Sequence, residues 1–149
     1  EGATATEGIR NVAELGSKTR LLQEVQTAIS AGTAFNTLSG GGISGGSGTV
    51  KLTFTISRDF PLVTLVSMIA PSPDWFVGVG GLNLLENGQW AAQKEIVLAL
   101  YDAGTDSGPS YASADVVTQP RQSITRITGF PALVDGAIKP FGTFAFLRK

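Results

Sequence analysis

The stretch "PLVTLVSMIAPSPDWFVGVGGLNLL", residues 61–85, contains two strand-like runs and the turn that separates them. The first run is nearly all apolar and rich in β-branched residues, which is typical of a central strand. Two prolines and an aspartate at Pro71–Asp74 then interrupt the apolar pattern. Asn87-Gly88 follows the second run and is the strongest short hairpin signal. With "QWAAQKEIVLALY" (residues 89–101), we expect three consecutive antiparallel strands.

Further strand and helix signals lie on both sides of this stretch. "VKLTFTISR" (50–58) alternates apolar and polar residues as a half-buried strand does, and "SITRITGF" (123–130) and "GTFAFLRK" (142–149) indicate further strands. "TRLLQEVQTAISAG" (19–32) has helical spacing, and "IRNVAELG" (9–16) indicates a short helical turn before it. Six or more strands after one early helix predict an antiparallel β-sandwich.

Composition excludes several classes of function. The 149 residues suit one domain over 1–149, and the net charge of −1 gives no electrostatic attraction to nucleic acid. The longest apolar stretch is about half the length of a membrane-spanning helix, so no span is expected. Cysteine and histidine are both absent, which excludes disulfides, thiolate zinc sites and the usual base of a serine triad. The opening "EGATATEG" is read as the start of a mature or excised chain whose targeting segment is missing.

Two motif matches fall in the glycine-rich tract and are rejected in context. "GGGISG" at Gly40–Gly45 satisfies a dinucleotide fingerprint, and "GISGG" at Gly42–Gly46 satisfies a serine nucleophile elbow. Both motifs require a strand before and a helix after, whereas a strand is expected to follow here. A flexible hairpin loop is the better interpretation. Ser72 and Ser107 are likewise interpreted as turn caps rather than catalytic groups.

Three aspartates are predicted to share one rim of the sheet: Asp74 in "PSPDWF", and Asp102 and Asp106 in "LYDAGTDSG". Alternate reversals of an antiparallel sheet lie at the same end, so the turn before residue 75 and the loop after residue 101 should meet. Lys94 is the only lysine or arginine between residues 71 and 120, and it falls within a strand. Such a cluster favours Ca²⁺, which takes about 6–8 oxygen ligands. The alternative is that Asp, Gly and Ser simply form turns that bind nothing.

The same two stretches also carry a family resemblance. "MIAPSPDWFVGV" (68–79) followed by "LYDAGTDSG" (100–108) resembles the spondin domain, a module of animal extracellular matrix proteins and of many secreted bacterial proteins. The resemblance implies a C2-like antiparallel β-sandwich with Ca²⁺ at one rim, held by the positions of Asp74, Asp102 and Asp106. Leu85 stands where animal members commonly carry a cysteine, and a glycine tract replaces a longer connection. These departures favour a bacterial origin.

The resemblance implies a secreted, non-enzymatic adhesion or binding module. Its expected partners are Ca²⁺ and an extracellular protein or a surface glycan, with neither nucleic acid nor a membrane span involved. Two alternatives stay open. One is a calcium-dependent hydrolase that uses a metal-bound water and a carboxylate base, for which Asp115 would serve if its loop folds back. The other is a structural domain in which the metal acts only as a staple.

Two aromatic residues and two arginines have both a structural and a ligand-binding interpretation, and we favour the structural one for each. Trp75 and Phe76 directly follow a candidate ligand, and the usual burial of large aromatics favours core anchors over a ligand platform. Arg121 and Arg126 are expected at solvated strand positions, with an anion contact as the alternative.

Overall fold

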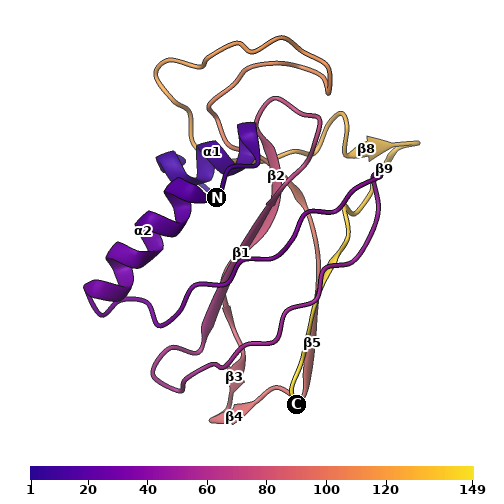
Figure 1. Ribbon diagram of the computed structural model, residues 1–149. Coiled ribbons are helices and arrows are strands. Elements are labelled where there is room, and N and C mark those ends of the chain that lie inside the picture. Colours follow the sequence, from indigo (N-terminus) through magenta and orange to yellow (C-terminus); the bar gives the residue numbers. More distant parts are fainter.

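The computed structural model describes residues 1–149 as two helices followed by ten short strands (Figure 1). The helices are α1 (Glu7–Leu15) and α2 (Thr19–Ser30). The strands are β1 (Leu62–Met68), β2 (Trp75–Asn83), β3 (Leu85–Glu86), β4 (Gln89–Trp90), β5 (Gln93–Val97), β6 (Leu100–Asp102), β7 (Thr125–Arg126), β8 (Leu133–Val134), β9 (Ala137–Ile138) and β10 (Thr143–Leu147).

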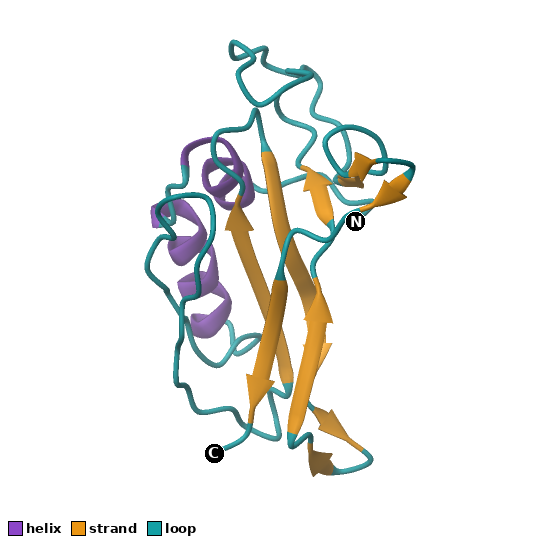
Figure 2. Cartoon of the chain, turned by 90° about the vertical axis from the view of Figure 1, so that its right-hand side faces the viewer, coloured by secondary structure: helices purple, strands orange, loops and turns teal.

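All strand pairs are antiparallel. The main sheet has the order β1-β2-β6-β7, and three two-stranded sheets pair β10 with β5, β3 with β4, and β8 with β9. α1 packs against β1 and β2, while the β5–β10 ladder lies on the other side of the main sheet (Figures 1 and 2). The prediction of a mostly-β chain with antiparallel sheets is confirmed, and the C2-like arrangement stays a prediction. Neither helix is long and apolar enough to cross a membrane.

Both helical signals of the N-terminal part form helices: the stretch at 19–32 contains α2, and the short turn expected at 9–16 is the longer helix α1. Thr6 caps α1 by accepting the Ile9 N–H at 3.2 Å, and Gly16 ends it at a left-handed φ of 65°. The Glu24 carboxylate of α2 then accepts the Gly8 N–H of α1 at 2.8 Å. This contact joins the start of α1 to α2.

Glu7 ties the start of α1 to a distant part of the chain. Its carboxylate pairs with Arg10 at 3.0 Å and also with Arg121, whose guanidinium reaches the Ala5 carbonyl as well. Hydrogen bonds from Arg121 and then Arg10 lower the pKa of Glu7. Arg121 is therefore not the solvated strand position that was predicted: it lies outside the strands and holds the N-terminal helix in place.

β2 supplies the centre of both core clusters because its side chains alternate between the two faces of the sheet. Phe76 packs under α1 in one cluster, and Trp75 lies on the opposite face in the other. Phe144 of β10 is partly buried and packs against the second cluster, which therefore lies between the main sheet and the β5–β10 ladder. Trp75 and Phe76 are 3% and 6% exposed, which confirms both as core anchors.

The strand predicted over residues 50–58 does not form. Only an isolated bridge between Ser57 and Phe60 occurs there, and Val50 and Leu52 are 40% and 46% exposed. The segment passes near the C-terminal strand, where Lys149 donates to the Thr53 hydroxyl at 3.0 Å. Alternation fits a half-buried strand, but no neighbouring strand offers this segment a hydrogen-bonded ladder.

The run predicted as one long strand after the hairpin is divided in two. β5 pairs with β10 and β6 pairs with β2, and the chain changes sheet at Leu98 and Ala99. Leu98 is 5% exposed and exchanges backbone hydrogen bonds with Phe141 and Gly142. The predicted hairpin at Asn87-Gly88 is present between β3 and β4, with φ of 50° and 75° at its two turn residues.

Candidate metal centre

Asp74 and Asp102 lie side by side where β2 begins and β6 ends. Trp75 at the start of β2 is the register partner of Asp102 at the end of β6. The Ala103 N–H also donates to the Asp74 carbonyl at 3.3 Å. The predicted meeting of the two rim segments is therefore confirmed, while the role of the aspartates as metal ligands stays a prediction.

Asp74 is fully buried, and its two carboxylate oxygens have different surroundings. Oδ2 accepts from the Thr105 N–H at 2.7 Å, the Asp106 N–H at 3.0 Å and the Thr105 hydroxyl at 3.1 Å. Oδ1 is buried and has no hydrogen-bond partner at all. An unsatisfied buried polar atom costs about 1–3 kcal/mol, and more when it is charged. The Oδ1 atom therefore lacks a compensating positive group.

Asp106 closes the loop that follows β6, drawn in orange at the top of Figure 1. It is 6% exposed, and its two oxygens accept the Gly108 N–H at 2.8 Å and the Val116 N–H at 3.1 Å. An isolated bridge to Val117 returns the far side of the loop to the same place. The carboxylate thus fixes the loop shape through backbone donors.

Asp102 is half-buried and bends the chain behind it. Its Oδ1 accepts the Gly104 N–H at 2.7 Å, and Gly104 adopts a left-handed φ of 73°. Burial raises the pKa of the Asp102 carboxyl, the charges of Asp74 and Asp106 raise it further, and the Gly104 hydrogen bond opposes them. The charged side chains that act on Asp102 are all negative, so no basic group neutralises the cluster.

Lys94 and Arg10, two basic side chains considered as neutralising groups, are engaged elsewhere. Lys94 lies on β5 as predicted and pairs with Glu86 at 2.5 Å. Arg10 shares a cavity of about 280 Å³ with Thr105, Asp106 and other residues, but its guanidinium pairs with Glu7 and Glu14. None of the five ion pairs in the structure includes Asp74, Asp102 or Asp106.

The three carboxylates do not form a ready-made set of metal ligands. No group of three or more His, Cys, Asp or Glu side chains has an arrangement that could hold a metal ion. Both Asp106 oxygens, Asp74 Oδ2 and Asp102 Oδ1 accept hydrogen bonds from the protein. The two oxygens left without a protein donor are Asp74 Oδ1 and Asp102 Oδ2, so oxygen-only cation binding fits the residues present but requires adjustment of Asp106.

Thr105, Ser72 and Ser107 make further polar contacts in the two rim segments. Thr105, 3% exposed, gives Asp74 two hydrogen bonds and was not singled out from the sequence, where its position between two aspartates was the only signal. Ser72 accepts the Trp75 N–H at 3.2 Å, and Ser107 donates to the Val116 carbonyl at 3.3 Å. Ser72 therefore acts within its turn, as predicted, whereas Ser107 is not a local turn cap but joins the two sides of the loop.

Fold and rim together define a class of protein: a mostly-β, antiparallel domain with buried carboxylates at one end of its main sheet. The comparisons with known proteins then give the family. The chain belongs to the Spondin_N family, whose model matches residues 1–135. The resemblance predicted from residues 68–79 and 100–108 is confirmed.

Two relatives show how much of a larger protein this chain covers. It is 37% identical to Spondin-2 of Homo sapiens over 122 residues, which are 81% of this chain and 37% of that protein. It is 31% identical to Spondin-1 of Gallus gallus over 135 residues, which are 85% of this chain and 16% of that protein. The chain therefore spans well under half the length of these relatives.

Proposed function

We propose that this domain is a secreted, non-enzymatic binding or adhesion module in which Ca²⁺ joins the turn at Pro71–Asp74 to the loop at Asp102–Asp106. The observation that carries the calcium proposal is the buried, unpartnered Asp74 Oδ1. A bound cation supplies the positive charge that this atom lacks. It also relieves the repulsion from Asp74 and Asp106 which, after burial, raises the pKa of Asp102.

The donor set favours calcium over other metals. The rim offers carboxylate, hydroxyl and carbonyl oxygens, and neither a thiolate nor an imidazole exists in the chain. Ca²⁺ accepts about 6–8 oxygens in flexible geometry, whereas Mg²⁺ requires a stricter octahedron. Asp74 Oδ1 and Asp102 Oδ2 would hold the ion, and Asp106 would join them by exchanging a backbone hydrogen bond for the metal. When bound, the ion links the two segments electrostatically.

The proposed extracellular role rests on the family. Membership of the Spondin_N family and identity to proteins named Spondin-1 and Spondin-2 support a secreted module. Its partner would be an extracellular protein or a surface glycan. Because the chain covers only part of those relatives, the partners of a whole relative do not transfer to it directly.

The hydrolase alternative has one geometric observation in its favour. The loop at 103–118 folds back, so that Asp115 and Asp106 line the same cavity. That cavity also holds the Arg10–Glu14 ion pair, however, and both oxygens of Asp106 already accept backbone N–H groups, from Gly108 and Val116. We therefore place the enzyme second to the binding module.

Thermal unfolding with Ca²⁺, with Mg²⁺ and with chelator tests the calcium site. A ligand at 100 times its dissociation constant adds about 2.7 kcal/mol, which raises the midpoint of a domain of this size by roughly 5–10 °C. We expect that shift with Ca²⁺, its loss in Asp102→Ala, and its retention in the matched control Asp59→Asn, whose exposed side chain makes no ion pair. Metal-free protein that shows no calcium shift would identify the three aspartates as turn residues only.

A further inference from the structure

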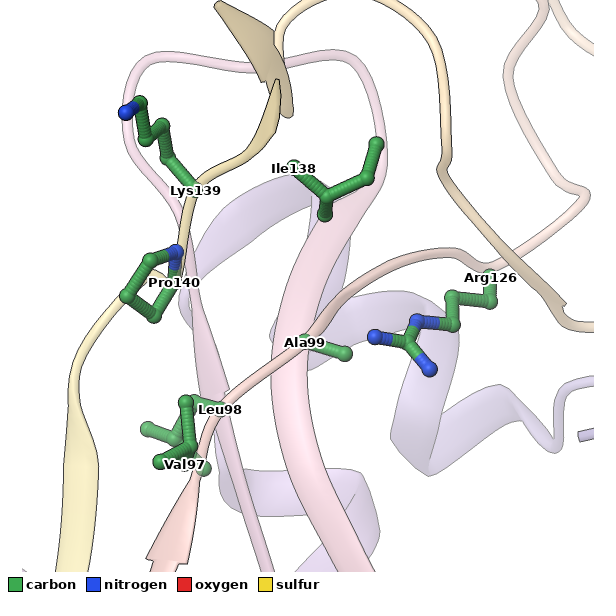
Figure 3. A pocket seen from close by; sticks show the side chains of 7 residues that line it. All are labelled: Val97, Leu98, Ala99, Arg126, Ile138, Lys139 and Pro140. Atoms are coloured by element: carbon green, nitrogen blue, oxygen red, sulfur yellow. The ribbon is translucent and has the colours of Figure 1, made fainter. Parts of the chain in front are cut away.

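A second cavity, which shares no lining residue with the three aspartates, lies at the place where the chain leaves the β5–β10 ladder and enters the main sheet. It has a volume of about 230 Å³. Figure 3 shows its lining, which comes from the end of β5 and the β5–β6 junction, from β7, and from the end of β9 and the segment after it. The lining residues are Val97, Leu98, Ala99, Arg126, Ile138, Lys139 and Pro140.

One part of this cavity is apolar and another carries unbalanced positive charge. Val97, Leu98, Ile138 and Pro140 supply hydrocarbon surface. The Arg126 guanidinium extends toward Ala99 in Figure 3, and Arg126 takes part in no ion pair and no side-chain hydrogen bond. No acidic residue lines the cavity. A guanidinium beside apolar walls is suited to a planar carboxylate that carries an apolar group.

The main chain at the same place has a free donor. Ala99 lies between β5 and β6 and belongs to neither strand. Its N–H makes no hydrogen bond within the protein. Ala99 therefore has an unused backbone donor in the lining of the cavity, and backbone N–H groups are donors with which proteins capture a terminal carboxylate.

The size of the cavity limits what it can take. Small-molecule sites usually measure about 300–1,000 Å³, and this cavity is smaller. It has room for one apolar side chain with its carboxylate, while the rest of a longer ligand would lie over the exposed Val97 side chain, which is 65% exposed. The C-terminal residue of a peptide matches both the volume and the charge.

We propose that this cavity binds the C-terminal carboxylate of a partner protein whose last residue is apolar, with Arg126 and the Ala99 N–H as the recognising groups. The side chain of the last residue occupies the space between Leu98, Ile138 and Pro140. Lys139 has its amino group directed away from the cavity in Figure 3 and contributes only long-range attraction. This site is separate from the calcium site and does not depend on it.

The test is fluorescence polarisation with a labelled pentapeptide that ends in leucine, measured in chelator so that the calcium proposal plays no part. The probes are the free acid and the C-terminal amide of the same peptide. Charge-assisted hydrogen bonds of this kind correspond to roughly tenfold to hundredfold in affinity. We expect the amide to bind weaker by that factor, and the Arg126→Gln variant to bind acid and amide equally weakly.

Lys139→Gln is the matched control, because it removes one positive charge from the lining of the same cavity and leaves the Arg126 guanidinium unchanged. We expect it to change the affinity of the free acid by less than about threefold, since exposed charges interact weakly. Circular dichroism of each variant establishes that the fold is intact. The proposal is overturned if acid and amide bind alike to the unmodified protein, if Arg126→Gln keeps the discrimination, or if 4-methylpentanoate alone binds as tightly as the peptide. Displacement of the peptide by a sulfated glycan but not by other free-acid peptides would also overturn it.

Discussion

Gly104 gives the sharpest test of how the acidic loop is built. Its φ of 73° is left-handed, and a Cβ added there would lie 2.5 Å from the Gln122 carbonyl oxygen. The Gln122 N–H also donates to the Gly104 carbonyl at 2.9 Å, so the two backbones are held together. Gly104→Ala therefore combines a strained backbone with a collision that no side-chain rotation relieves.

The two contributions can be separated with a second glycine. A left-handed residue with a Cβ costs about 1–2 kcal/mol, and an overpacked contact costs about 1–3 kcal/mol more. Gly81 in β2 has a φ of 61° and nothing within 4 Å of an added Cβ, so Gly81→Ala carries the first cost alone. Urea unfolding of both variants should give free energies of unfolding that differ by about 1–3 kcal/mol, with Gly104→Ala the less stable. Equal destabilisation would refute the close approach of Gly104 to Gln122.

Three further predictions concern the core, the rim and the N-terminal helix. Leu100→Ala should lower the free energy of unfolding by about 2–5 kcal/mol because this side chain is 1% exposed, whereas Leu147→Ala, at 74% exposed, should change it by less than about 0.5 kcal/mol in the same urea titration. Thr105→Val should cost about 1–3 kcal/mol, since it removes a hydroxyl donor from the buried Asp74 carboxylate, and a neutral result by thermal unfolding would contradict that bond. Glu7 has a pKa in the folded protein that lies below its ordinary value of 4.5. Its stabilising effect is therefore present above pH 4.5 and is lost as the pH falls through the lowered pKa. The difference in free energy of unfolding between the unmodified protein and Glu7→Gln should accordingly shrink between about pH 7 and pH 3.

The meeting of Asp74 and Asp102 at one rim could be predicted from the sequence, because it depends only on the number of chain reversals between them and on the residues that form the turns. Asn87-Gly88 places one reversal, and the prolines at 71 and 73 place another, so Asp74 and Asp102 must come to the same end of the sheet. Only the register is needed beyond this, and it pairs Trp75 with Asp102. The contacts of Thr105 could not be predicted in this way, because they depend on how the loop closes over the carboxylate.

The wrong predictions have a common physical cause. The pattern of residues 50–58 reports which side chains could be buried, but it carries no information on whether a partner strand lies within hydrogen-bonding distance. The uniformly apolar run at residues 96–100 gives no sign of the point where the chain changes sheet. Asp135-Gly136, by contrast, is a hairpin dipeptide that can be read from the sequence, and it forms the β8–β9 turn.

The change of sheet at Leu98 and Ala99 has a mechanical consequence. One continuous backbone belongs to both layers, and only two residues separate its last pair in one ladder from its first pair in the other. Sliding of the layers past one another would stretch this junction and pull Leu98 from the core, where its backbone is bonded to Phe141 and Gly142. The domain therefore resists shear between its layers, and a force applied at the end of β10 passes through the hydrogen bonds to β5 and then along the covalent backbone to β6, which ends at Asp102.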